Sequence, residues 1–170
     1  TLMNCLGPLL NPAGVRLQLV GVYAPELVEP IAEALGELGA IRALVVHGSD
    51  GLDEITTCGR TDAALLADGA VSPLVIDAAS FGIPPPLRGA LRGGSAKESA
   101  DIVRSLLEGE SGARRDIVLI NAAAGIWVAG AAEGLEEGIE LARRSIDSGA
   151  ARERLEMLIA ASNAGVDVGE

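Results

Sequence analysis

The fold is decided by residues 17–47, which read LQLVGVYAPELVEPIAEALGELGAIRALVVH. The stretch begins with apolar and β-branched residues at 17–22, a pattern that predicts a strand. After Pro25 the apolar residues recur at helical spacing until Gly39, a helix stop signal. Residues 41–47 are almost all apolar, as expected of a strand buried on both faces. Strand, helix and strand joined by short connections predict a parallel βαβ unit with a right-handed crossover.

The segment before this unit, residues 1–14, is interrupted by two prolines. Pro8 and Pro12 each restrict the residue before them, which disfavours helical geometry there. We therefore expect extended or turn geometry around Gly7 and Asn11.

Beyond the βαβ unit, a polar loop rich in glycine leads to two further candidate strands, at residues 62–67 and 71–77. The turn between them, Ala67-Asp68-Gly69, contains the Asp-Gly pair typical of a β-hairpin. A hairpin adds an antiparallel pair to the parallel one. We therefore predict an α/β fold whose central sheet is mixed, mostly parallel and flanked by helices.

The second half of the chain is predicted to be mainly helical after a rigid proline-rich connector at 83–86. Helical spacing and end signals place four helices, at residues 95–107, 116–130, 135–148 and 151–161. The first opens with a capping box, Ser95 to Glu98. The second is apolar on every side, so we expect it to be buried all round. No repeat or linker marks a second domain, and we expect a single α/β domain over residues 1–170.

Composition restricts the class of protein. The formal net charge is −11, and proteins that bind nucleic acid usually carry a basic patch, so we expect no nucleic-acid ligand. No apolar stretch approaches the roughly 20 residues that cross a bilayer, and no signal-peptide pattern opens the chain. Cys5 and Cys58 lie in no CxxC arrangement and are interpreted as small buried hydrophobes. Unpaired thiols without an export signal favour a cytoplasmic location.

The loop after the second strand, His47-Gly48-Ser49-Asp50-Gly51-Leu52-Asp53-Glu54, is the richest in polar groups. In α/β sheets, ligands usually bind outside the carboxyl ends of the strands, which is where this loop falls. Asp50, Asp53 and Glu54 supply hard oxygen ligands of the kind that Mg²⁺ prefers. A solvated acidic turn with capping residues has the same spacing, so the pattern alone leaves both interpretations open.

Two further motifs are ambiguous. His47 is the only histidine, and it is either a general base or a strand-end residue hydrogen-bonded to the backbone. Arg92-Gly93-Gly94-Ser95 precedes a helix, where backbone N–H groups can bind an anion, yet a plain turn into a capped helix explains it equally well.

The motifs NCLGPLLNPAG, LVGVY, ALVVHGSDGLDEI, LRGGSAKESA, RRDIVLINAAAGIWVAGAAEGLEEGIELA and IDSGAA occur in this order between Met3 and about Leu158. Together they resemble the anthranilate phosphoribosyltransferase family of tryptophan biosynthesis. The resemblance implies the large domain of the nucleoside phosphorylase and phosphoribosyltransferase fold. It also implies the reaction in which the anthranilate nitrogen displaces pyrophosphate from C1 of phosphoribosyl pyrophosphate.

The resemblance also implies site residues. Asp53 and Glu54 match the acidic pair that helps to hold Mg²⁺ against the diphosphate, and Gly7 and Pro8 match the Gly-Pro of the anthranilate channel. It implies no catalytic side chain in this chain.

The family's N-terminal helical domain, which forms its homodimer, and its pyrophosphate loop have no counterpart here. We therefore expect an inactive part of a longer enzyme. The alternative is a transferase-like protein without this activity, either nucleoside phosphorylase-like or a module that binds a ligand or nucleic acid.

Overall fold

The computed structural model describes residues 2–164, and the side chains of residues 6–164. Four strands form one sheet in the order β1-β2-β3-β4: β1 (Leu17–Gly21), β2 (Arg42–Gly48), β3 (Arg60–Ala67) and β4 (Ala70–Asp77). β1 and β2 are parallel, whereas β2–β3 and β3–β4 are antiparallel. The sheet is mixed, as expected, but the expectation that it is mostly parallel is wrong. A parallel pair needs a long crossover, and only the first connection supplies one.

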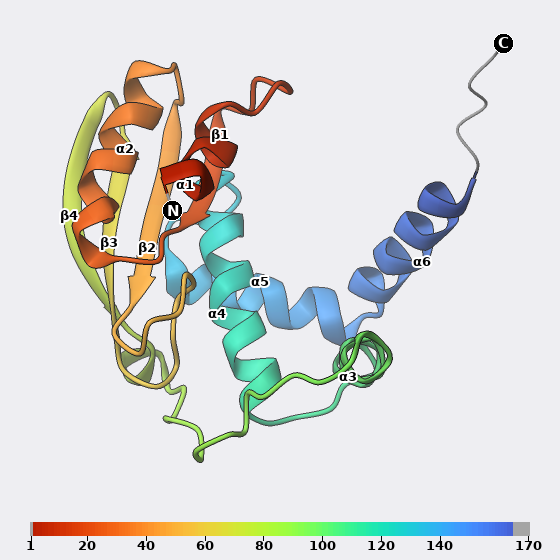
Figure 1. Cartoon of the computed structure of the whole chain (residues 1–170). Coiled ribbons are helices and arrows are strands. Elements are labelled where there is room, and N and C mark those ends of the chain that lie inside the picture. The colour runs from red at the N-terminus through yellow and green to blue at the C-terminus, as the bar shows by residue number, and fades with distance from the viewer. Residues whose placement is uncertain (1, 165–170) are drawn as a thin grey trace, which may run out of the picture.

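The predicted βαβ unit is present. A 3₁₀ turn at Pro25–Leu27 leads into α2 (Val28–Glu37), which crosses from β1 to β2. The helix covers one face of the sheet and encloses an aliphatic core with β1, β2 and β3 (Figure 1). Buried members of this core are Val20, Val28, Ile31, Ala32, Leu35, Val45, Ala64 and Leu66.

The predicted hairpin is also confirmed. Asp68 has a φ of 52° and Gly69 a φ of 75°, so both central residues of the turn are left-handed. This is the condition for the tight turn that matches the twist of the strands, and Asp-Gly meets it at low steric cost. Ala67 and Ala70 flank the turn as a register pair.

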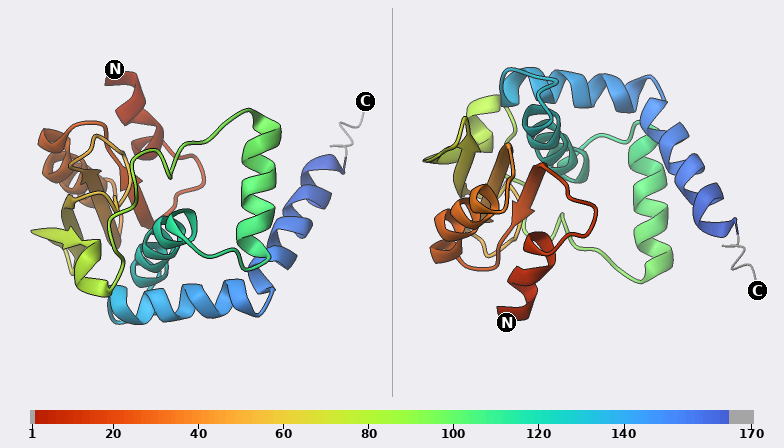
Figure 2. Two further views of the ribbon diagram at one scale, coloured as in Figure 1. Left: turned by 90° about the horizontal axis from the view of Figure 1, so that it is seen from below. Right: turned by 90° about the horizontal axis from the view of Figure 1, so that it is seen from above.

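The opposite face of the sheet is covered by α4 (Ala113–Val128), so that the sheet lies between α2 and α4 (Figure 2). α5 (Leu135–Asp147) packs across α4 and approaches so closely that a Cβ on Gly138 would lie 2.7 Å from the carbonyl oxygen of Ala123. The expectation that α4 is buried all round is wrong, because its Val118 is 40% exposed. The sheet and α5 cover only two sides of α4.

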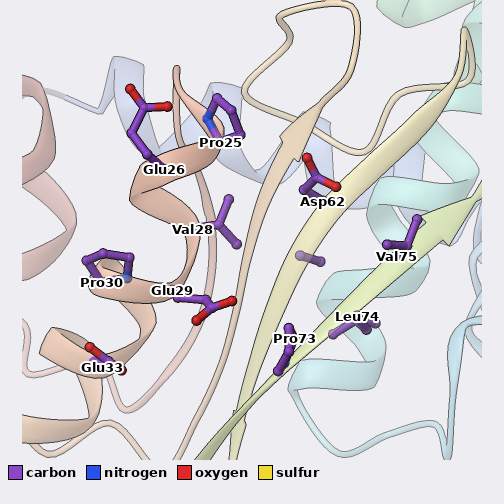
Figure 3. A pocket seen from close by; sticks show the side chains of 11 residues that line it. Pro25, Glu26, Val28, Glu29, Pro30, Glu33, Asp62, Pro73, Leu74 and Val75 are labelled. Atoms are coloured by element: carbon purple, nitrogen blue, oxygen red, sulfur yellow. The ribbon is translucent and has the colours of Figure 1, made fainter.

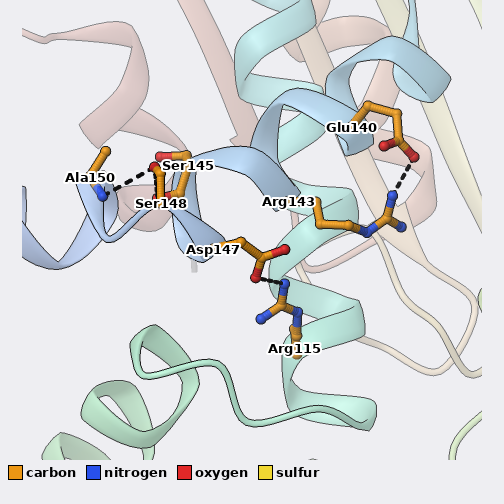
Figure 4. Close-up of polar contacts among 7 residues, drawn as sticks. All are labelled: Arg115, Glu140, Arg143, Ser145, Asp147, Ser148 and Ala150. Atoms are coloured by element: carbon orange, nitrogen blue, oxygen red, sulfur yellow. Dashed lines mark hydrogen bonds and ion pairs between the residues drawn. The ribbon is translucent and has the colours of Figure 1, made fainter.

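Two helices project from the layered body: α3 (Ala96–Leu107), which opens with the predicted capping box, and α6 (Ala150–Asn163) (Figures 1 and 2). A small core anchors α3 to α4 and α5 through Leu106 and Leu119. An ion pair between Arg115 of α4 and Asp147 of α5 lies beside it (Figure 4). α6 has no fully buried side chain.

The N-terminal segment forms α1 (Leu2–Leu9), with Pro8 inside it, so the expectation of extended geometry at Gly7-Pro8 is wrong. The fixed φ of proline suits a helix, and α1 ends one residue later. Leu9 packs against the α2 core, which gives the short helix a tertiary contact. The turn expected at Asn11 is present, because its side chain accepts a hydrogen bond from the N–H of Ala13 (3.0 Å).

None of the helices in the described part of the chain is both long enough and apolar enough to cross a bilayer.

Candidate functional site

The acidic loop, residues 49–59, leaves the carboxyl end of β2 beside the carboxyl end of β1. The two backbones touch there. A Cβ on Gly21 would lie 1.6 Å from the carbonyl oxygen of Asp53, far inside any permitted contact. Glycine at position 21 therefore allows the backbone of Asp53 to lie against the end of β1.

His47 contributes to the same junction. It is buried, and its Nδ1 lies 2.8 Å from the carbonyl oxygen of Val22. A carbonyl can only accept, so Nδ1–H donates. Val22 in turn donates its N–H to Val46 (3.0 Å). Of the two interpretations of His47, the strand-end residue bonded to backbone matches these contacts.

A cavity of about 110 Å³ opens at this junction, and both Pro8 and Asp53 line it. Gly21 and Tyr23 are also lining residues, and Tyr23 is 52% exposed. The structure thus brings together two residues that lie 45 positions apart in the sequence. Gly7 is exposed on α1 and does not line the cavity, and neither does Glu54.

The three acidic side chains of the loop differ in their surroundings. Asp50 accepts a hydrogen bond from the hydroxyl of Thr56 (2.8 Å), so it holds the turn together. Asp53 and Glu54 are exposed, and their carboxylates have no hydrogen bond or ion pair within the part of the chain that the structure describes. The capping interpretation fits Asp50, whereas Asp53 and Glu54 leave their oxygens available to a ligand.

Two unpaired carboxylates on consecutive residues match the number that Mg²⁺ commonly takes from a protein, its shell being completed by water and substrate phosphate. Over residues 6–164, whose side chains the structure describes, there is no group of three or more His, Cys, Asp and Glu side chains able to enclose a metal. An ion held by Asp53 and Glu54 would therefore need further ligands.

The far end of the loop is anchored to the core. Ile55 is fully buried, and its backbone N–H and carbonyl both bond to the side chain of Asn121 on α4. The N–H of Thr56 donates to the hydroxyl of Thr61 (3.0 Å). Sequence reasoning missed Asn121 and Tyr23. The signals were a lone amide inside an apolar helix and an aromatic residue just past the end of a strand.

The segment Arg92-Gly93-Gly94-Ser95 matches the capped-turn interpretation. Glu98 accepts hydrogen bonds from the N–H and the hydroxyl of Ser95, both at 2.7 Å. The side-chain bond, and then the backbone bond, lower the pKa of Glu98. The first turn of α3 therefore already carries a carboxylate of its own.

A larger cavity, of about 590 Å³, lies between α2 and the strands β3 and β4 (Figure 3). Glu29 and Glu33 on α2, Glu26 on the 3₁₀ turn before it and Asp62 on β3 line this cavity. None of the four residues predicted from the sequence to bind metal or substrate lines it. Cys58 is exposed, which corrects its interpretation as a buried hydrophobe, and the side chain of Cys5 lies outside the described residues.

Comparison with known proteins agrees with the motifs. Residues 1–152 match the family model described as glycosyl transferase family, a/b domain. The chain is 51% identical over 164 residues to an anthranilate phosphoribosyltransferase of Sinorhizobium medicae, covering 96% of the chain and 48% of the relative. It is 52% identical over 160 residues to that of Rhodospirillum rubrum, covering 94% and 46%.

Solved structures show the same relation. The anthranilate phosphoribosyltransferase of Thermus thermophilus superposes with a TM-score of 0.85 at 40% identity, covering 94% of this chain and 47% of that one. The Saccharomyces cerevisiae enzyme in complex with phosphoribosyl pyrophosphate and Mg gives 0.78 at 26% identity, covering 92% and 45%. The chain spans about half the length of these relatives. It belongs to the glycosyl transferase family and contains that family's α/β domain.

Proposed function

We propose that this chain is the C-terminal α/β domain, residues 1–170, of an anthranilate phosphoribosyltransferase. The whole enzyme would transfer the phosphoribosyl group from phosphoribosyl pyrophosphate to anthranilate in tryptophan biosynthesis, in the cytoplasm. The observation that carries the proposal is the cavity at the ends of β1 and β2, where Pro8 and Asp53 meet. Those two residues belong to the two motifs that the family resemblance ties to anthranilate and to the metal.

In the transfer, the amine nitrogen of anthranilate bonds to C1 of the sugar as the C1–O bond to the diphosphate breaks. The nitrogen then loses a proton, and the diphosphate leaves with the bonding pair. A bound Mg²⁺ would neutralise the charge that develops on the diphosphate. Asp53 and Glu54 would hold this ion, because the two residues are consecutive in the sequence and both are exposed.

The remaining residues of the site bind and orient. Gly21 leaves room for the backbone of Asp53, and His47 bonds to the backbone just past the end of β1. We propose that Pro8, together with Gly7 on the same helix, borders the anthranilate channel. A solved structure of the yeast enzyme in complex with 4-fluoroanthranilate, related at 28% identity, supports an aromatic acid as the acceptor.

The site in this chain is partial, and we propose that the rest of the enzyme completes it. Within the described residues β1 pairs only with β2, although parallel strands are normally flanked and buried. Leu17 of this strand is 42% exposed, and α6 exposes Met157 and Leu158. Apolar surface of this kind favours a covering domain. At full length we propose a homodimer.

Co-expression tests the proposal. The chain is produced alone, and also together with the N-terminal half of the Sinorhizobium medicae relative, and formation of phosphoribosyl-anthranilate is measured with Mg²⁺. We expect turnover only from the combination. Turnover by the chain alone would contradict the partial site, and a stable complex of the two halves without turnover would contradict the transferase function.

A further inference from the structure

Asn121 lies in the middle of α4, and its side chain closes a ring with the backbone of Ile55. The N–H of Ile55 donates to Oδ1 of Asn121, and Nδ2 of Asn121 donates to the carbonyl oxygen of Ile55, both at 2.9 Å. The same Nδ2 also donates to the carbonyl of Ile117 one turn earlier in α4, again at 2.9 Å. The third bond fixes the amide on its own helix while the other two hold the loop.

These two bonds have the pattern of a backbone pair in a β-sheet, with the side-chain amide of Asn121 in the place of a neighbouring strand. Only an amide offers a donor and an acceptor side by side at this length. A carboxylate lacks the donor, and an aliphatic side chain lacks both. Ile55 is fully buried among residues of α4 such as Ile120 and Ala124, so its backbone groups have no access to solvent as a replacement.

The two hydrogen bonds between Asn121 and the backbone of Ile55 form a clamp. This clamp lies directly next to the acidic pair, because Asp53 and Glu54 are the two residues before Ile55. Upstream, the backbone of Asp53 is pressed against Gly21. The pair therefore lies between a close backbone contact with β1 on one side and the hydrogen bonds to α4 on the other. Neither Asp53 nor Glu54 has a bond of its own to a described residue that would orient it.

We propose that Asn121 is a positioning residue for the metal-binding pair Asp53 and Glu54. It touches neither the metal nor the substrate. It sets the direction in which the two carboxylates leave the loop, as residues behind a metal ligand commonly do. This inference rests on the proposed function, because it requires that the pair binds a divalent cation.

The test uses the chain itself and Mn²⁺, a paramagnetic ion that carboxylates bind as they bind Mg²⁺. Broadening of the backbone amide signals at 50–57 reports binding, and hydrogen exchange at Ile55 reports the clamp. Asn121→Leu removes both bonds to Ile55, and Asn121→Asp removes only the donor. Val128→Ala is the matched control, because Val128 belongs to the same helix and the same core but its side chain makes no hydrogen bond to the loop.

We expect both Asn121 variants to need about 10- to 100-fold more Mn²⁺ for half-broadening, with faster exchange at Ile55. Val128→Ala should leave the Mn²⁺ midpoint unchanged while lowering the unfolding temperature. An unchanged midpoint in Asn121→Leu, with protection at Ile55 lost, would overturn the positioning role. If Asn121→Leu fails to fold, the nearly isosteric Asn121→Asp decides by the same criterion.

Asp53→Asn and Glu54→Gln separate this inference from the proposed function. If they shift the midpoint and the Asn121 variants do not, only the inference fails. If they leave it unchanged, the pair does not bind the cation, and the metal role and the inference fail together.

Discussion

Replacing Gly21 by alanine tests whether the end of β1 holds the acidic loop in place. The added Cβ would lie 1.6 Å from the carbonyl oxygen of Asp53 and 2.5 Å from its carbonyl carbon. Both atoms belong to the backbone, so no side-chain rotation can relieve the clash. The loop must retreat by at least about 1.4 Å to reach the 3.0 Å below which real Cβ contacts essentially never fall. Overpacking of this kind costs about 1 to 3 kcal/mol of unfolding free energy.

The assay pairs urea unfolding with Mn²⁺ titration of the folded chain. Gly21→Ala should lower the unfolding free energy and weaken Mn²⁺ binding together. Gly138→Ala is the control, because its Cβ would meet the backbone of Ala123 at 2.7 Å, between α4 and α5, and would meet no atom of the acidic loop. It should destabilise the chain and leave Mn²⁺ binding unchanged. Wild-type stability and metal binding in Gly21→Ala would refute the close approach.

Two further predictions concern the loop anchor and the capped helix. Ile55→Ala should lower the free energy of unfolding in urea by about 2 to 5 kcal/mol, because this side chain is fully buried in the core under α4. A smaller loss would show that the loop is not anchored there. The lowered pKa of Glu98 makes its contribution to α3 present above the usual value of 4.5 and lost as the pH falls through the lower folded value. Protection of the α3 amides, measured relative to their intrinsic exchange rates, should therefore fall on acidification in wild type and show no such change in Glu98→Gln.

Local signals predicted much of the fold. The βαβ unit follows from the apolar period of α2 and the unbroken run of β2, and both are properties of neighbouring residues. The Asp68-Gly69 turn and the Ser95–Glu98 capping box were predicted in the same way, because each is a short-range arrangement of backbone and side chain.

The errors concern properties that depend on distant residues. Pro8 lies within a helix that also packs Leu9 against the α2 core, and this tertiary contact is not visible in the local pattern around the proline. The antiparallel pairing of β2 with β3 depends on the course of the intervening loop. Val118 is exposed because the sheet and α5 cover other sides of α4. The composition of the helix alone does not show which side is left uncovered.

The candidate site divides in the same way. Asp53 and Pro8 could be singled out by motif, but that they line one cavity is visible only in the fold. Asn121 bonds to a residue 66 positions away in the sequence. A polar residue in an apolar helix could be noticed from the sequence, but its partner Ile55 could not be identified.

We propose that the acidic pair after β2, Asp53 and Glu54, binds the metal of a phosphoribosyl transfer. The most direct test measures phosphoribosyl-anthranilate formation by the chain combined with the N-terminal half of a relative, as wild type and as the double variant Asp53→Asn, Glu54→Gln. We predict that the double variant loses about 100-fold or more in kcat/KM, since charge stabilisation of the leaving diphosphate is removed. Equal turnover, with equal dependence on Mg²⁺, would contradict the claim.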